Sequence, residues 1–139
     1  MAGRFVGDVS PEQAWQGLVA DPKAVLVDVR TKPEWQYVGV PDMSSLNRSL
    51  IKVEWQVYPS MEKNRAFSSE IVAKGVKIDQ PVFIICRSGI RSKAAAELLA
   101  GLGYVTYNVA DGFEGQIDAA GHRGVSGGWK IAGLPWKQT

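Results

Sequence analysis

The sequence predicts an α/β protein with a mostly parallel β-sheet that helices cover on both faces. Three observations support this fold class. Short apolar runs alternate along the chain with segments whose apolar residues recur at helical spacing. The runs at 24–29, interrupted only by Asp28, and at 82–86 are continuous, as in strands buried on both faces of a parallel sheet. The length of 139 residues suits one hydrophobic core, so we expect residues 1–139 to form a single domain.

The first helix is expected to begin after Ser10. Ser10 is a suitable N-cap, Pro11 is tolerated in the first helical turn, and Gln13 completes a capping box. One apolar face follows at helical spacing, formed by Ala14, Trp15, Leu18 and Val19. These signals predict an amphipathic helix that ends at Asp21-Pro22.

The remaining elements follow from the same kinds of pattern. Strands are expected at residues 24–29, 50–57, 82–85 and 105–109, and helices at 33–37, 67–74 and 93–102. Residues 39–49 are rich in turn-forming side chains and are predicted to form a loop. A turn is expected at Asp111-Gly112, and a single helical turn at residues 129–132.

Composition and charge exclude several classes of function. The net charge is +2, and basic residues are interleaved with acidic ones, so no nucleic-acid partner is expected. No apolar run is long enough to cross a membrane, and the N-terminus has no signal-peptide core, so we expect a cytoplasmic protein without a membrane partner. One cysteine, Cys86, and one histidine, His122, allow neither an intrachain disulfide nor a structural zinc site.

Polar residues follow two of the predicted strands at the points where these strands end. Asp28 and Arg30 stand at the end of the first strand, and residues 86–92 follow the strand at 82–85. In an open parallel sheet, ligands bind beyond the carboxyl ends of the strands. Both groups are therefore expected at one edge of the sheet, where they define a candidate site.

The segment of residues 86–91 has the chemistry of an anion-binding loop. Because a strand runs directly into it and a helix follows directly, backbone N–H groups without partners can converge on an anion. Gly89 permits the tight turn, and the guanidinium groups of Arg87 and Arg91 can recognise oxyanions. Cys86 begins the loop, where each of these effects favours thiolate over thiol. The sequence thus predicts a reactive thiolate beside an oxyanion site.

Each of these residues also has a purely structural interpretation. Cys86 could be an inert buried residue, but an inert cysteine needs no loop of this composition. Arg91 could be a charge on a helix surface, although a cation at a helix N-terminus opposes the helix dipole. For Asp28, an ion pair with Arg30 or a loop arginine is favoured over a role as catalytic acid. His122 is best explained as a surface residue.

At this point the sequence resembles the single-domain rhodaneses. The matching segments occur in the family's order and are residues 26–30 with 33–35, 82–92, 108–115 and 129–135. The resemblance implies a central sheet of about five strands and transfer of a sulfane sulfur through a persulfide on Cys86, without a metal or organic cofactor. It implies Cys86 as the catalytic residue, a substrate-binding loop of Arg87, Ser88, Gly89, Ile90 and Arg91, and supporting roles for Asp28, Arg30 and Ser92.

Two departures from the family pattern affect the expected site. Residues 38–43 contain no histidine, although many family members carry one there. Residues 116–128 look like a Gly-rich insertion, and long loops without secondary structure are often functional. We hypothesise that this segment forms a flap over Cys86 and brings His122 or Arg123 towards the substrate.

The predicted activity is sulfur transfer from thiosulfate or a similar anionic donor to a thiol or cyanide, carried out by a monomer. The same loop would equally serve a sulfur carrier or regulatory module that delivers persulfide to a protein partner. A cysteine phosphatase or arsenate reductase is disfavoured, because only four residues separate Cys86 from Arg91, one fewer than those enzymes need. A redox sensor is disfavoured because the chain has no second cysteine to resolve an oxidised Cys86.

Overall fold

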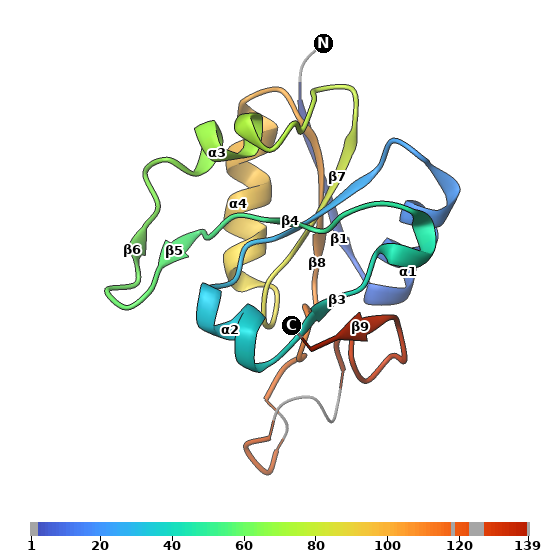
Figure 1. The fold of residues 1–139 in the computed structure, drawn as a ribbon, viewed down its shortest axis with the longest axis vertical. Coiled ribbons are helices and arrows are strands. Elements are labelled where there is room, and N and C mark those ends of the chain that lie inside the picture. Colours follow the sequence, from blue (N-terminus) through green and yellow to red (C-terminus); the bar gives the residue numbers. More distant parts are fainter. Residues whose placement is uncertain (1–2, 118, 123–126, 139) are drawn as a thin grey trace.

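The fold is built on a parallel β-sheet that runs through the centre of the molecule (Figure 1). The computed structural model describes residues 3–117, 119–122 and 127–138. The sheet has five strands in the order β1-β8-β7-β2-β4, and every neighbouring pair is parallel. These strands are β1 (Arg4–Val9), β2 (Val25–Asp28), β4 (Ile51–Lys52), β7 (Pro81–Ile85) and β8 (Val105–Val109). The predicted fold class is therefore confirmed.

Helices cover both faces of this sheet because alternate residues of its central strands point to opposite sides. On β7, Val82 and Ile84 belong to the core beneath α3 (Phe67–Ala73) and α4 (Ile90–Gly101). Phe83 and Ile85 belong instead to the core beneath α1 (Pro11–Ala20). The remaining helix, α2 (Lys32–Tyr37), follows β2 at the carboxyl edge of the sheet.

Two of the helix starts follow directly from local sequence. The predicted capping box forms at α1, where the Ser10 hydroxyl accepts from Gln13 N at 3.1 Å and the Gln13 side chain accepts from Ser10 N at 2.9 Å. Helix α4 begins at Ile90, three residues before the predicted start, because Gly89 takes a left-handed conformation (φ 104°) as its N-cap. The last residues of the cysteine loop are therefore the first turn of α4.

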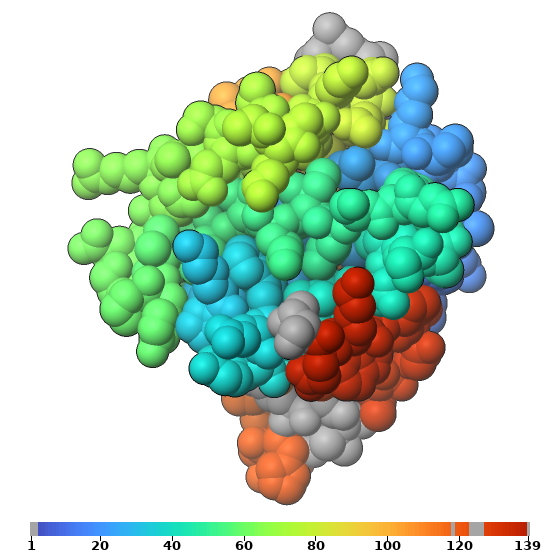
Figure 2. All heavy atoms as spheres, viewed as in Figure 1, coloured from blue at the N-terminus to red at the C-terminus, as the bar shows by residue number. Residues whose placement is uncertain are grey.

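The predicted strand at 50–57 is wrong as a single element. Only β4 pairs with the main sheet, while β5 (Gln56–Val57) pairs with β6 (Glu62–Lys63) in a separate antiparallel hairpin. An apolar run does not reveal where a chain leaves one sheet, so the break could not be predicted. Figure 2 shows the hairpin in green at the side of the molecule, next to α2.

Three further segments differ from the predictions. Strand β1 was not predicted, since it is a half-exposed edge strand with Gly7 in its middle. The predicted loop at 39–49 contains β3 (Val40–Pro41), which pairs with β9 (Trp136–Lys137), and a short 3-10 helix. Residues 129–132 form hydrogen-bonded turns instead of a helix. Figure 2 shows the C-terminal segment in red against the surface near β3.

Among the helices in the described part of the chain, none is long and apolar enough to span a bilayer.

Candidate active site

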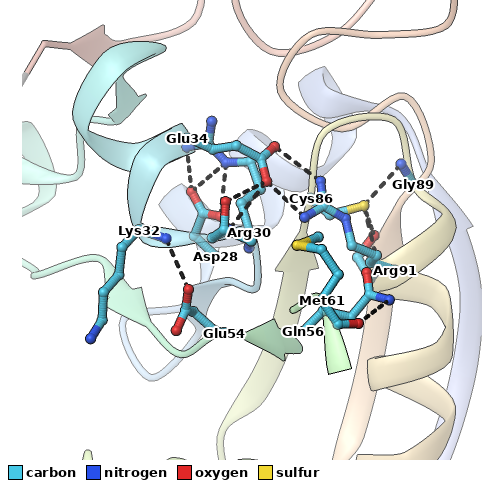
Figure 3. Close-up of polar contacts among 12 residues, drawn as sticks. Asp28, Arg30, Lys32, Glu34, Glu54, Gln56, Met61, Cys86, Gly89 and Arg91 are labelled. Atoms are coloured by element: carbon cyan, nitrogen blue, oxygen red, sulfur yellow. Dashed lines mark hydrogen bonds and ion pairs between the residues drawn. The ribbon is translucent and has the colours of Figure 1, made fainter. Parts of the chain in front are cut away.

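Cys86 lies directly after β7, and the loop that follows curls around its sulfur (Figure 3). The side chain is almost fully buried, with 1% of its surface exposed. Its Sγ accepts hydrogen bonds from Gly89 N at 3.1 Å and Ser92 N at 3.3 Å. The backbone donors predicted for this loop thus point at the cysteine sulfur.

A chain of buried polar groups supports Cys86 from behind. The Ser92 hydroxyl lies 3.3 Å from Cys86 Sγ and 2.5 Å from Asn108 Oδ1. Asn108 Nδ2 donates to Asp8 Oδ1 at 3.0 Å and to Gly89 O at 3.2 Å, which orients the amide with its oxygen towards Ser92. Because a hydroxyl has one proton, Ser92 can donate either to Asn108 or to the sulfur, but not to both at once.

Replacement of Ser92 by alanine tests this support. The variant removes the hydroxyl that donates to the Asn108 oxygen or to the sulfur, and it leaves the buried Asn108 oxygen without this donor. We expect a loss of about 1–3 kcal/mol in the free energy of unfolding and about tenfold in turnover. Urea denaturation and a sulfur-transfer assay measure the two effects. Ser69→Ala is the matched control, because that exposed hydroxyl on α3 donates to the carbonyl of Ala66, the N-cap residue, and its effect should be small.

Arg91 is held by a carboxylate that the sequence analysis did not identify. Its Nη1 lies 2.7 Å from Glu34 Oε1 and its Nη2 lies 3.0 Å from Glu34 Oε2, which makes a two-pronged ion pair between α4 and α2. Thr31 also donates to Glu34 Oε1 from its backbone N and its hydroxyl, at 3.2 and 3.0 Å. Arg91 is therefore no free cation but one half of an ion pair.

This pair shifts the pKa of both partners. Burial raises the pKa of Glu34, but hydrogen bonds and charge from Arg91, together with hydrogen bonds from Thr31, outweigh burial and leave the pKa below its ordinary value. Burial lowers the pKa of Arg91, but the hydrogen bonds and charge of Glu34 raise it above its ordinary value. Both side chains thus stay charged at neutral pH.

The lowered pKa of Glu34 predicts how stability depends on pH. A carboxyl whose pKa falls on folding stabilises the protein above its unfolded pKa, and this contribution disappears as pH drops through the folded value. Glu34→Gln lacks it. The difference in unfolding free energy between wild type and Glu34→Gln should therefore be largest near neutral pH and shrink in acid. Urea denaturation over a pH series measures it, and a difference that grows in acid would contradict the assignment.

Asp28 and Arg30 form the ion pair that the sequence analysis favoured. Arg30 Nη2 lies 2.7 Å from Asp28 Oδ2, and both side chains are fully buried. Arg30 also donates to Gly39 O at 2.7 Å and lies over the Phe113 ring at 4.4 Å. Neither Asp28 nor Arg30 lines the cavity at Cys86, so their position is that of a support for the carboxyl edge of the sheet.

A cavity of about 350 Å³ opens at Cys86. Its lining comes from the cysteine loop, from α2 and from the β5–β6 hairpin: Cys86, Arg87, Ser88, Ile90, Arg91, Glu34, Gln56 and Met61. Met61 has a left-handed backbone (φ 59°), with its N donating to Val57 O at 2.7 Å and its O accepting from Gln56 Nε2 at 3.2 Å. No sequence signal pointed to the hairpin residues, since they come to the site through tertiary packing.

The Gly-rich segment at 116–128 contacts the cysteine loop through its first residue. Gln116 Nε2 donates to Ser88 O at 2.6 Å. Just after the segment, Trp129 N donates to Gly112 O at 2.8 Å, which ties the residue that follows the segment to the turn that precedes it. Residues 118 and 123–126, including Arg123, lie outside the described residues, and His122 is exposed. The flap over Cys86 stays a prediction.

Metal chemistry was not expected from the sequence. Within residues 3–117, 119–122 and 127–138, no group of three or more potential ligand side chains gathers in one place.

Comparisons with known proteins agree with this fold. A family model described as the STR4 middle domain matches residues 6–139. The crystal structure of Rv0390 from M. tuberculosis is 48% identical, with a TM-score of 0.89 over 98% of this chain and 100% of that chain. An uncharacterised protein of Rickettsia rickettsii is 38% identical over 95% of this chain and 98% of its own length. Thiosulfate sulfurtransferase GlpE of Actinobacillus succinogenes is 30% identical over 92% of this chain and 87% of its own length. The chain therefore belongs to the single-domain rhodanese-like family of sulfurtransferases.

Proposed function

We propose that this protein moves a sulfane sulfur from thiosulfate or a similar donor to a thiol or cyanide, through a persulfide on Cys86. One observation carries the proposal. The only sulfur nucleophile of the chain lies at the cavity, with Gly89 N and Ser92 N at 3.1 and 3.3 Å from its Sγ. These donors stabilise a thiolate before the reaction and the negative charge of a persulfide after it.

The reaction proceeds in two displacement steps. The Cys86 thiolate attacks the outer sulfur of thiosulfate, so that a Cys86 S–S bond forms while the S–S bond of thiosulfate breaks, and sulfite leaves with the bonding electron pair. Cyanide or a thiol then attacks the terminal sulfur of the persulfide, and the Cys86 thiolate leaves. The covalent intermediate divides the transfer into two steps, and neither step requires an oxidant.

Intact-mass spectrometry after exposure to thiosulfate tests the proposal. We expect the mass to rise by one sulfur atom, the adduct to map to the peptide that contains Cys86, and cyanide to remove it with release of thiocyanate. Alkylation beforehand is a clean control, because the chain has one cysteine, and the alkylated protein should gain no sulfur. An unchanged mass in unmodified protein with every donor tested would refute the proposal.

The rim of the cavity favours a second candidate, a sulfur carrier that serves a protein acceptor. Ile90 is 77% exposed and Met61 is 39% exposed, although both line the cavity at Cys86. Exposed apolar side chains beside a reactive group are typical of surfaces that contact proteins. Turnover compared among cyanide, small thiols and protein thiols distinguishes the two functions, since a carrier would transfer sulfur slowly to the small acceptors.

A further inference from the structure

A carboxylate lines the same cavity that the loop chemistry predicts to bind anions. Glu34 stands on the wall of the cavity at Cys86, opposite the loop, and points towards Arg91 (Figure 3). The side chains of Glu34 and Arg91 are 19% and 17% exposed. A negative charge is thus fixed beside the reacting sulfur, in a place only partly screened by water.

The ion pair occupies the donors that an oxyanion would use. Both terminal nitrogens of Arg91 bond Glu34, at 2.7 and 3.0 Å. An anionic donor must therefore compete with a carboxylate for Arg91, in a geometry that already suits a carboxylate. Thr31 holds Glu34 with two more hydrogen bonds, so the carboxylate does not leave readily.

The side chains of the cavity wall as a whole carry no net charge when Cys86 is ionised. Its charged groups are the guanidinium groups of Arg87 and Arg91, the Glu34 carboxylate and, when ionised, the Cys86 thiolate. These charges cancel. Gln56, Met61 and Ile90 supply an uncharged or apolar surface beside them. A dianion such as thiosulfate gains no net attraction from these side-chain charges, whereas an uncharged organic group can contact the apolar side chains.

We propose that Glu34 is a specificity-determining residue that disfavours dianionic sulfur donors and favours the persulfide of a small uncharged thiol. The proposal rests on the proposed function, because it presumes that Cys86 accepts sulfur. In the favoured reaction the Cys86 thiolate attacks the terminal sulfur of R–S–SH. A Cys86 S–S bond forms, the S–S bond of the donor breaks, and R–S⁻ leaves with the electron pair and takes a proton from water.

Loading of Cys86 by two donors of different charge tests the inference. Thiosulfate is the dianion, and the persulfide of 2-mercaptoethanol is the small donor with an uncharged organic group. Rates of persulfide formation are followed by mass spectrometry after mixing. The organic persulfide should load Cys86 of the wild type with a higher kcat/KM than thiosulfate does. This comparison uses the wild type alone and does not depend on any variant. A wild type that prefers thiosulfate would overturn the inference and leave the proposed function standing.

Glu34→Gln then assigns the preference to one charge. We expect kcat/KM for thiosulfate to rise about tenfold, mainly through KM, while the value for the organic persulfide changes by less than about twofold. Glu34→Asp keeps the charge and should keep the wild-type preference. Glu12→Gln is the matched control, since that exposed residue occupies the first turn of α1, away from the cavity, and should change neither value.

Two results separate failure of the inference from failure of the proposed function. Equal changes for both donors in Glu34→Gln, with Cys86 still loaded, would show that Glu34 only positions Arg91. No loading of Cys86 by either donor in the wild type would overturn the inference and the proposed function together.

Discussion

Replacing Cys86 with alanine or serine is expected to abolish both the sulfur adduct and turnover, with a loss of at least about 10³-fold in rate. The reason is chemical. Cys86 is the only cysteine of the chain, so no other thiolate can accept the sulfur. A serine hydroxyl in its place is not ionised at neutral pH and does not form a persulfide. Intact-mass spectrometry after exposure to thiosulfate, together with a thiocyanate assay, measures the two losses.

The serine variant also serves as the control for folding. Cys86 is buried in the core beneath α3 and α4, and serine has nearly the same volume, so the variant should unfold cooperatively near the wild-type temperature. Circular dichroism checks this before the kinetic comparison. Turnover by a folded Cys86→Ser at close to the wild-type rate would assign the chemistry to another group.

Gly89→Ala is expected to have the largest effect on the structure of the loop. A Cβ at this position would lie 2.0 Å from the Ala110 carbonyl oxygen, and the backbone has φ of 104°, a conformation that side-chain-bearing residues rarely adopt. The loop must move, which displaces the Gly89 N–H from Cys86 Sγ. We expect a loss of about 3 kcal/mol or more in the free energy of unfolding and loss of most sulfur transfer.

Gly101→Ala is the matched control for that change. Gly101 is the last residue of α4, and an added Cβ would meet no heavy atom within 4 Å. Because alanine favours helix more than glycine does, this variant should be as stable as wild type or more stable by up to about 1 kcal/mol. Urea denaturation compares the three proteins. A Gly89→Ala variant with wild-type stability and full Cys86 loading would contradict the geometry of the loop.

Several features were predictable because their signals lie within a few residues of one another. The capping box of α1 needs only Ser10 and Gln13, and the structure contains it. The cysteine loop needs a strand, a glycine and a helix in immediate succession, and β7, Gly89 and α4 supply them. The partners of the buried ion pair, Asp28 and Arg30, are only two positions apart in the sequence. In each case the backbone geometry of one short segment decides the contact.

The rest of the site depends on residues that are far apart in the chain. Glu34 reaches Arg91 across 57 residues, and Asp8 reaches Asn108 across 100. Glu34, Asp8 and Asn108 are polar residues without a distinctive local pattern, so nothing in the sequence marked them as neighbours of the cysteine loop. The position of the hairpin that carries Met61 could not be predicted either, because β5 and β6 pair with each other and not with the main sheet.

The sequence by itself determined a cysteine in a strand–loop–helix junction at the carboxyl edge of a parallel sheet, because local backbone geometry builds that junction. Only the tertiary structure decided how much charge surrounds the cysteine. The loop has two arginines, but the packing of α2 against α4 pairs Arg91 with Glu34 and leaves Arg87 exposed to solvent. The net field at Cys86 is a sum over groups brought together by folding, so the composition of the loop alone could not reveal it.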